Sequence, residues 1–343
     1  MASIIKLINS ALIGLNSRQK EVITARFGLD GQTDGETLAA IGDRLSVTRE
    51  RVRQIENGAI AIVKTNISKN PEAGVILENI KKYIVGRGGV AKKADVVKFA
   101  STLATGIREN HLDFLAEASG AFNLYREDEA FNPFYYVTEK DLKSARTFID
   151  GWVGFLKSRK EKVFADSYSV QLATFLKAKP IAPAVADTYL AVSKLIDKNP
   201  YGDMGLREWP EISPATVRDK IYLVLKKKAE PLHFEDIAKH INKVGFDDQE
   251  ALAPTVHNEL IKDNRFVLVG RGIYGLKEHG YEPGTAREVI AKVLKSKGPL
   301  KPNEVVTNVN AQRFFKANTI LINLQNRNFF ERMNDGKYRV RES

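Results

Sequence analysis

The clearest pattern in this sequence lies between Thr37 and Val63, where apolar and polar positions alternate with the period of an α-helix. The spacing predicts two helices joined by a short turn, one over Leu38 to Leu45 and a second that starts after Thr48. Thr48 is the predicted N-cap, because its hydroxyl can accept a hydrogen bond from a backbone N–H group in the first turn of the second helix. Apolar residues recur at three- and four-residue steps on one face of the second helix: Val52, Ile55, Ala59 and Ile62. This face must be buried against other elements.

The opposite face of the second helix carries long polar side chains. Its outward positions are Glu50, Arg53, Gln54 and Asn57, flanked near the N-terminal end by Arg49 and Arg51. Arginine can donate two hydrogen bonds to guanine, glutamine can pair with adenine, and glutamate can accept a hydrogen bond from cytosine. A second helix that presents these residue types from its first turns is typical of a helix-turn-helix domain that reads bases in the major groove of DNA.

Residues on either side extend this domain. A leading helix that packs on the core is predicted from the helical spacing of Ile4, Ile5, Ile8, Leu12 and Leu15. After Val63, asparagine, proline and glycine residues interrupt the helical pattern in the segment from Lys64 to Gly74. We expect a linker in this segment, so that the first domain spans residues 1–70.

From Gly74 onward the chain resembles a set of repeats, and the likeness is clearest in its last two segments. The first of these contains Thr216, Arg218, Asp219, Ile221, Val224, Leu225, Lys226 and Lys228, which correspond without gaps to Thr285, Arg287, Glu288, Ile290, Val293, Leu294, Lys295 and Lys297 in the second. Each segment then ends in two short alternating runs around a glycine, Phe266 to Leu276 and Phe329 to Val340. Such runs predict a β-hairpin.

Three helices followed by a hairpin make a winged helix. Fainter copies precede the last two, with hairpin strands at Phe122 to Tyr125 and Phe134 to Val137 in the first copy and a hairpin over Lys198 to Trp209 in the second. The predicted fold class is therefore mainly α, a helix-turn-helix domain followed by tandem winged-helix repeats. The predicted domains are residues 1–70, 74–139, 140–212, 213–280 and 281–343.

The composition indicates the kind of partner. The 343 residues include 53 Lys and Arg against 42 Asp and Glu, a net charge of +11, which favours a polyanion such as nucleic acid. Apolar runs are too short for a membrane span, and Lys6 and Asn9 interrupt the first ten residues, so we expect neither a membrane helix nor a signal peptide. The expected location is the cytoplasm, at the nucleoid of a bacterium.

The sequence lacks the signatures of an enzyme. Without cysteine it can form no disulfide, no zinc-thiolate site and no cysteine nucleophile. No histidine pair has HExxH spacing, and neither a GxSxG nor a Walker motif occurs. The segment Gly86 to Lys93 is glycine-rich, but it lacks the spacing of a phosphate-binding loop and is better explained as a turn. We therefore expect no catalytic residue, no metal site and no cofactor.

Two stretches, Leu15 to Leu29 and Glu36 to Glu56, closely resemble region 4 of sigma-70 factors, and the run VTRERVRQIE from Val47 is the most specific part. The resemblance implies that the bases of a minus-35 promoter element are read by Arg49, Glu50, Arg53 and Gln54. It implies phosphate contacts by Arg18, Arg26, Thr37 and Thr48, to which we add the neighbouring Arg51. Gly58 departs from the family, where a good helix former is usual, and should weaken the helix by roughly 0.5 to 1 kcal/mol.

The last two segments resemble HARE-type helix-turn-helix domains, winged helices found in the delta subunit of bacterial RNA polymerase and in some chromatin proteins and restriction enzymes. The resemblance covers Thr216 to Lys277 well and the final segment moderately, and it implies a fold more than a contact. Arg271 and Lys337 stand beside glycines at the predicted wing tips. A cation there can meet phosphate or enter a minor groove, although hairpin tips also carry solvated cations without a specific role.

These features predict a sequence-specific DNA-binding transcription factor related to sigma-70 region 4, which acts in or regulates initiation with RNA polymerase. It would not be a complete sigma factor, because nothing resembles the aromatic helix with which sigma factors melt the minus-10 element. The expected partners are promoter-like duplex DNA and the polymerase core, whose β flap region 4 of sigma factors also binds. Two alternatives stay open: a free-standing repressor or activator, and a winged-helix scaffold that binds nucleic acid or polymerase without sequence preference. Glu50 disfavours purely nonspecific binding, because an acid repels phosphate unless a base amino group pairs with it.

Overall fold

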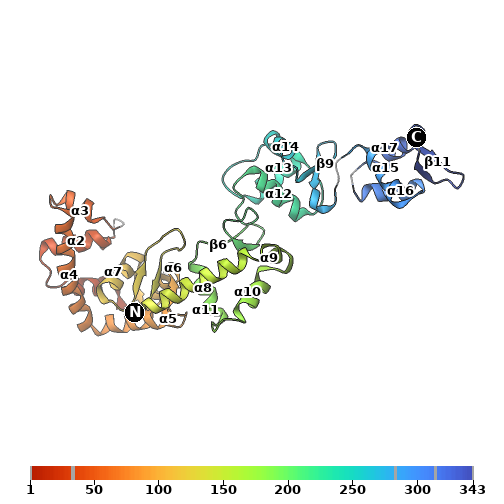
Figure 1. The fold of residues 1–343 in the computed structure, drawn as a ribbon. Helices are drawn as coiled ribbons and strands as arrows, with labels where there is room; N and C mark the ends of the chain where they lie inside the picture. The colour runs from red at the N-terminus through yellow and green to blue at the C-terminus, as the bar shows by residue number, and fades with distance from the viewer. Residues whose placement is uncertain (1, 32–34, 282–283, 313–314, 342–343) are drawn as a thin grey trace. The chain divides into compact units, whose positions relative to one another are not determined.

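The computed structural model describes residues 2–31, 35–281, 284–312 and 315–341 (Figure 1). The chain divides into two compact units, Met1–Asp197 and Lys198–Ser343. Both are built mainly from helices, with small sheets of two or three strands. Within the described ranges, no helix combines the length and the apolar character that crossing a membrane requires.

The first unit begins with the predicted leading helix and helix-turn-helix. Their elements are β1 (Ala2–Ser3), α1 (Ile4–Ala11), α2 (Ser17–Phe27), α3 (Leu38–Arg44) and α4 (Arg49–Lys69). The buried face of α1 consists of Ile4, Leu7, Ile8 and Ala11. Ile5 was wrongly assigned to this face: it is 63% exposed, because one step along a helix turns the side chain about 100° away.

The linker expected at Lys64 to Gly74 does not exist. Helix α4 continues to Lys69, and α5 (Pro71–Val85) follows after the single residue Asn70. The Asn70 side chain accepts hydrogen bonds from the backbone N–H groups of Glu72 and Ala73 at 3.0 and 3.2 Å, and Pro71 occupies the first helical position, where its missing N–H costs nothing. The Asn-Pro pair therefore marks a bend between two helices.

One hydrophobic core joins the first helices to the next part of the chain. It extends from Ile4 through Ala59, Val63 and Ile80 to Tyr135, all of them fully buried. Helix α7 (Glu109–Ser119) packs along α4 and supplies Leu112 and further buried residues. Residues before and after Asn70 are therefore parts of the same packed body.

The segment after Asn70 alternates helices and short strands. After α5 come β2 (Val90–Lys92), α6 (Lys93–Ala100), β3 (Ala104–Thr105), α7, β4 (Asn123–Tyr125) and β5 (Phe134–Tyr136). Strands form a sheet in the order β2-β5-β4, and β3 pairs in parallel with β1. The two hairpin strands expected at Phe122 to Tyr125 and Phe134 to Val137 are present as β4 and β5.

Four helices complete the first unit: α8 (Glu139–Lys157), α9 (Lys160–Asp166), α10 (Tyr168–Leu176) and α11 (Pro183–Val192). Helices α8 and α11 pack on β2, and the turn before β2 is so close to α8 that a Cβ atom at Gly89 would lie 2.2 Å from Cγ of Asp141. Only glycine fits here, also because its φ is +77°. The strands β6 (Ile196–Lys198) and β7 (Met204–Leu206) follow and pair with each other.

After β7, the second unit contains two similar sets of elements. The first set is α12 (Val217–Lys228), β8 (Leu232–His233), α13 (Phe234–Val244), α14 (Ala253–Lys262), β9 (Phe266–Gly270) and β10 (Ile273–Leu276), with a 3-10 turn over Lys277–His279. The second set is α15 (Ala286–Lys297), α16 (Pro302–Asn310), α17 (Ala317–Leu324), β11 (Phe330–Arg332) and β12 (Tyr338–Val340). Each set has a hydrophobic core of its own.

The strand register shows the same plan in three places. In the sheets β2-β5-β4 and β8-β10-β9, the strand between the first two helices pairs with the last strand of the hairpin. A tyrosine lies at this pairing in each set, with Tyr135 opposite Ala91, Tyr274 opposite Leu232, and Tyr338 opposite Leu300. The first unit therefore contains the same arrangement as the two sets of the second unit.

Candidate nucleic-acid interface

A small core fixes the angle between α3 and α4. It consists of Val22 and Ala25 from α2, Ile41 from α3 and Val52 from α4. The turn between the two helices is tight: a Cβ atom at Gly42 would lie 2.7 Å from the carbonyl oxygen of Val47. The geometry of a helix-turn-helix is thus set by a few apolar contacts and one close backbone approach.

The predicted base-reading residues all lie on the first two turns of α4, and all of them are exposed. The guanidinium of Arg53 donates two hydrogen bonds to the carboxylate of Glu50, at 2.9 and 2.8 Å. Arg51 donates to the amide oxygen of Gln54 at 3.1 Å. The hydrogen bond from Arg53 holds the pKa of Glu50 below its usual value, so this carboxyl stays ionised at neutral pH. Arg49 completes the exposed set.

Thr37 and Thr48 are the N-caps of α3 and α4. The Thr37 hydroxyl accepts from the N–H of Ala40 at 3.1 Å, and the Thr48 hydroxyl accepts from the N–H of Arg51 at 3.2 Å. The predicted cap at Thr48 is confirmed. Both helices therefore begin at exposed ends where backbone N–H groups and the helix dipole favour an anion.

Two arginines predicted to touch phosphate also make contacts within the protein. Arg18 donates to the carbonyl of Leu45 at 2.9 Å and so ties α2 to the turn. Arg26 donates to Glu56 at 3.2 Å and to the carbonyl of Glu36 at 2.9 Å. Because the Arg26 side chain is only 22% exposed, less of its guanidinium faces solvent than in Arg18.

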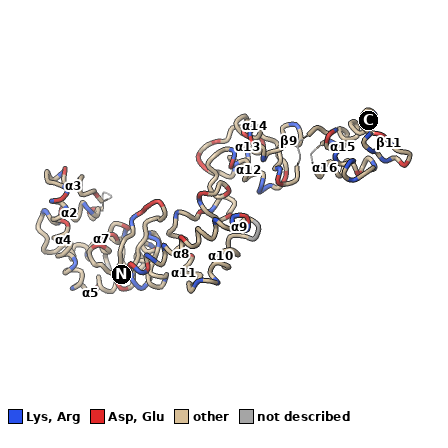
Figure 2. Tube along the Cα trace, viewed as in Figure 1, with Lys and Arg blue, Asp and Glu red and all other residues tan. Residues whose placement is uncertain are grey.

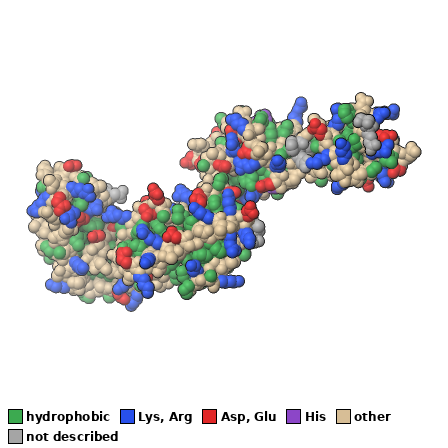
Figure 3. Space-filling view, viewed as in Figure 1, with side chains coloured by type: hydrophobic (Ala, Val, Ile, Leu, Met, Phe, Trp, Pro, Cys, Tyr) green, Lys and Arg blue, Asp and Glu red, His purple; other side chains and the backbone are tan. Residues whose placement is uncertain are grey.

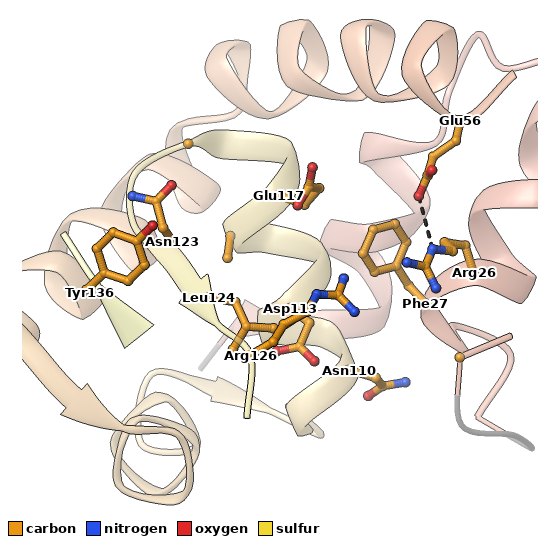
Figure 4. Close-up of a pocket in the computed structure, with 13 residues that line it drawn as sticks. Arg26, Phe27, Glu56, Asn110, Asp113, Glu117, Asn123, Leu124, Arg126 and Tyr136 are labelled. Carbon is orange, nitrogen blue, oxygen red and sulfur yellow. Dashed lines mark hydrogen bonds and ion pairs between the residues drawn. The ribbon is translucent and has the colours of Figure 1, made fainter. Parts of the chain in front are cut away.

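Arg26 and Glu56 border a hollow of about 520 Å³ between α2, α4 and α7 (Figure 4). Polar side chains from α7, among them Asp113 and Glu117, line its other side. At its edge the Asn110 amide donates to the carbonyl of Gly28 at 2.6 Å. This contact holds the end of α2. No local sequence pattern predicts it, because the partners are 82 residues apart.

The two predicted wing-tip cations differ in their surroundings. Arg271 is exposed between β9 and β10, beside Gly272, whose φ is +69°. Lys337 lies next to β12, and its ammonium group is 3.4 Å from the carboxylate of Asp335. Of the two side chains, Arg271 is the one that projects without an ion pair among the described residues.

In the described part of the chain, no group of three or more His, Asp or Glu side chains could hold a metal ion. Lys and Arg positions occur along the whole trace (Figure 2), and basic side chains gather over the helices α2 to α4 (Figure 3). An exposed helix face with paired Arg, Glu and Gln side chains can donate and accept hydrogen bonds at base edges.

Residues 11–64 match sigma-70, region 4. RNA polymerase sigma factor RpoD of two strains of Helicobacter pylori is 49% identical to this chain over 72 residues, which are 21% of the chain and 10% of RpoD. RNA polymerase sigma-B factor of a Nostoc species is 42% identical over 57 residues, 17% of each chain. The chain thus spans no more than about a sixth of the length of these relatives. For the N-terminal part, the region 4 similarity indicates a DNA-binding role in transcription.

Proposed function

We propose that this chain is a sequence-specific DNA-binding transcription factor whose α3 and α4 read a promoter-like element. In this proposal the bases are contacted by Arg49, Glu50, Arg53 and Gln54. The neighbouring phosphates are contacted by Arg18, Arg26, Thr37, Thr48 and Arg51. The observation that carries the proposal is the exposed, hydrogen-bonded set of side chains on the first turns of α4, within the segment that matches region 4.

The pairing of Glu50 with Arg53 supports base reading over simple attraction to phosphate. An ionised carboxylate on the face that meets DNA repels the backbone, so it lowers affinity for every sequence alike. It raises affinity only where a cytosine amino group lies within reach. By accepting hydrogen bonds from two nitrogen atoms on one edge of the guanidinium, Glu50 also limits the directions in which Arg53 can point.

We further propose that the segments after Asn70 are winged helices, with domains at residues 74–139, 140–212, 213–280 and 281–343. The recurring strand pairing, with a tyrosine at the same place, supports this assignment for residues 74–139, 213–280 and 281–343. The first of them uses its third helix, α7, for packing against α4. That helix is therefore not free to enter a groove of DNA, and the domain serves as a support for the region 4-like helices.

The proposed role in initiation is to act with RNA polymerase, through its β flap, without replacing a sigma factor. The region 4 similarity supports a link to polymerase, and the repeats that fill the rest of the chain support a role other than that of RpoD. The test is transcription in vitro from a template that carries the bound sequence. Specific transcripts from core polymerase and this protein alone would contradict the proposal, whereas a change in transcripts that still require a sigma factor is the expected result.

DNA reading is tested by selecting bound sequences from a random duplex pool. The wild-type protein should enrich a motif, and Arg53→Ala should relax one position of it, with a loss of about fivefold to a hundredfold in discrimination there. Lys64→Ala is the matched control, because Lys64 is an exposed cation on the same helix, four turns from its start. It should leave the motif unchanged.

The alternative is a scaffold that binds nucleic acid or polymerase without sequence preference. One observation favours it for the last domain: α17, the helix that a winged helix would place in the groove, contains no charged residue. If the selection enriches no motif while salt-sensitive binding persists, the scaffold is the better explanation.

A further inference from the structure

The positive charge of this protein is concentrated at its C-terminal end. Residues 281–343 contain twelve Lys and Arg against six Asp and Glu, so this stretch carries +6 of the net charge of +11. None of this charge lies on α17. Five of the twelve cations lie on the hairpin β11–β12 and the segments that flank it: Arg327, Arg332, Lys337, Arg339 and Arg341.

A hollow of about 670 Å³ opens between the end of α17 and this hairpin. Three exposed arginines border it: Arg327 from the loop after α17, Arg332 at the end of β11, and Arg341 directly after β12. None of the three forms an ion pair with a described residue. The only internal hydrogen bond from these guanidinium groups runs, within the described ranges, from Arg341 to the carbonyl of Arg327 at 2.9 Å.

The other groups in the lining suit a phosphate ligand. Gln325 and Tyr338 offer an amide and a hydroxyl that can donate hydrogen bonds. The one carboxylate of the lining, Glu331, is neutralised by Arg339, which donates to it at 3.0 and 2.9 Å. Phe330 also belongs to the lining, but it is only 2% exposed and offers little apolar surface to a partner.

We propose that this hollow binds the phosphate backbone of duplex DNA, so that the protein holds DNA at a second place, without reading bases. Three guanidinium groups without an ion pair around one hollow suit a polyanion with successive phosphates, because each guanidinium can bind one phosphate at two points. The proposal rests on the proposed function in taking DNA as the ligand, but it does not require base reading by α4.

The test compares variants of the full chain on duplexes that carry either the selected motif or a scrambled sequence. Removing the three cations together, with Arg327→Gln, Arg332→Gln and Arg341→Gln, should lower affinity for both duplexes by the same factor. It should also reduce the slope of log affinity against log salt by about 2 to 3, since each phosphate contact contributes about 0.9. The ratio of affinities for the two duplexes should not change.

Arg332→Gln and Lys295→Gln are a matched pair, because each removes one exposed cation from the last domain and only Arg332 lines the hollow. The first should reduce the salt slope by about one unit, and the second should leave it nearly unchanged. Single variants serve if the triple variant fails to fold, which its thermal unfolding curve reports.

Two results would overturn the proposal. One is a triple variant that binds both duplexes with wild-type affinity and salt slope, which would show that the hollow does not bind duplex DNA. The other is an equal loss in Arg332→Gln and Lys295→Gln, which would show that only the overall charge matters. Failure of base reading by α4 can be told apart from failure of this proposal. The wild-type protein would then bind both duplexes equally, and Arg332→Gln would still lower the affinity for each.

Discussion

Replacing Gly58 by alanine should stabilise the protein. Gly58 is exposed in the middle of α4, and an added Cβ atom would meet nothing closer than Nε2 of Gln19, at 3.9 Å. The added methyl group therefore disturbs no packing. Alanine also loses less backbone conformational entropy on folding than glycine does. The gain should be about 0.5 to 1 kcal/mol. For a unit of this size that corresponds to a rise of roughly 1 to 4 °C in Tm.

Gly42→Ala is the contrasting variant on the same helix-turn-helix. Here the added Cβ atom would lie 2.7 Å from a backbone oxygen, that of Val47, and the backbone cannot move aside without opening the turn. We expect a loss of about 1 to 3 kcal/mol. Thus the same chemical change, glycine to alanine in a helix, should have opposite signs sixteen residues apart.

Both effects can be measured by thermal unfolding of the full chain together with hydrogen exchange in peptides from α3 and α4. Gly58→Ala should slow exchange in α4, and Gly42→Ala should speed it in both helices. A Gly58→Ala protein that is less stable than wild type would refute the reasoning. It would mean that the glycine fits a bend or a contact that a straight, exposed α4 does not have.

Other changes should act through single contacts. Thr48→Ala removes the N-cap that accepts from the N–H of Arg51, and unfolding in urea should show a loss of about 1 kcal/mol, with Thr48→Ser close to wild type. The hydrogen bond from Arg265 lowers the pKa of Asp263 below the ordinary 3.8, so this carboxylate contributes stability that is present above that pH and is lost as pH falls through the folded pKa. Asp263→Asn should therefore be less stable at pH 7 but lose less stability on acidification, and an unchanged acid profile in the variant would count against this account.

The parts of the fold that could be predicted from the sequence depend on neighbours along the chain. Thr48 as a cap, the paired openings at Thr216 and Thr285, and the glycine turns of the hairpins all follow from local spacing. Both repeat openings are indeed capping boxes, closed by Asp219 and Glu288. Because each interaction spans only a few residues, pattern and structure agree there.

The features of the fold that could not be predicted from the sequence depend on contacts between distant residues, or on residue types that fit more than one structure. Asn70 and Pro71 end one helix and start another, and the same two residue types mark linkers equally well, so only packing distinguishes the two cases. The hydrogen bond from Asn110 to Gly28 joins residues that no repeat or period relates. The candidate base-reading face was visible because its residue types are unusual together, whereas the arginines around the C-terminal hollow are scattered over the sequence.

The continuity of α4 has a mechanical consequence. Its 21 residues make a rod of about 31 Å, at 1.5 Å per residue, with the candidate DNA-reading turn at one end and the shared core around the other. A flexible tether would let the reading end pivot freely on its target. If DNA binds at the first turns of α4 as proposed, a rigid helix packed in the shared core would pass a tilt of that DNA on to the helices it packs against, α5 and α7.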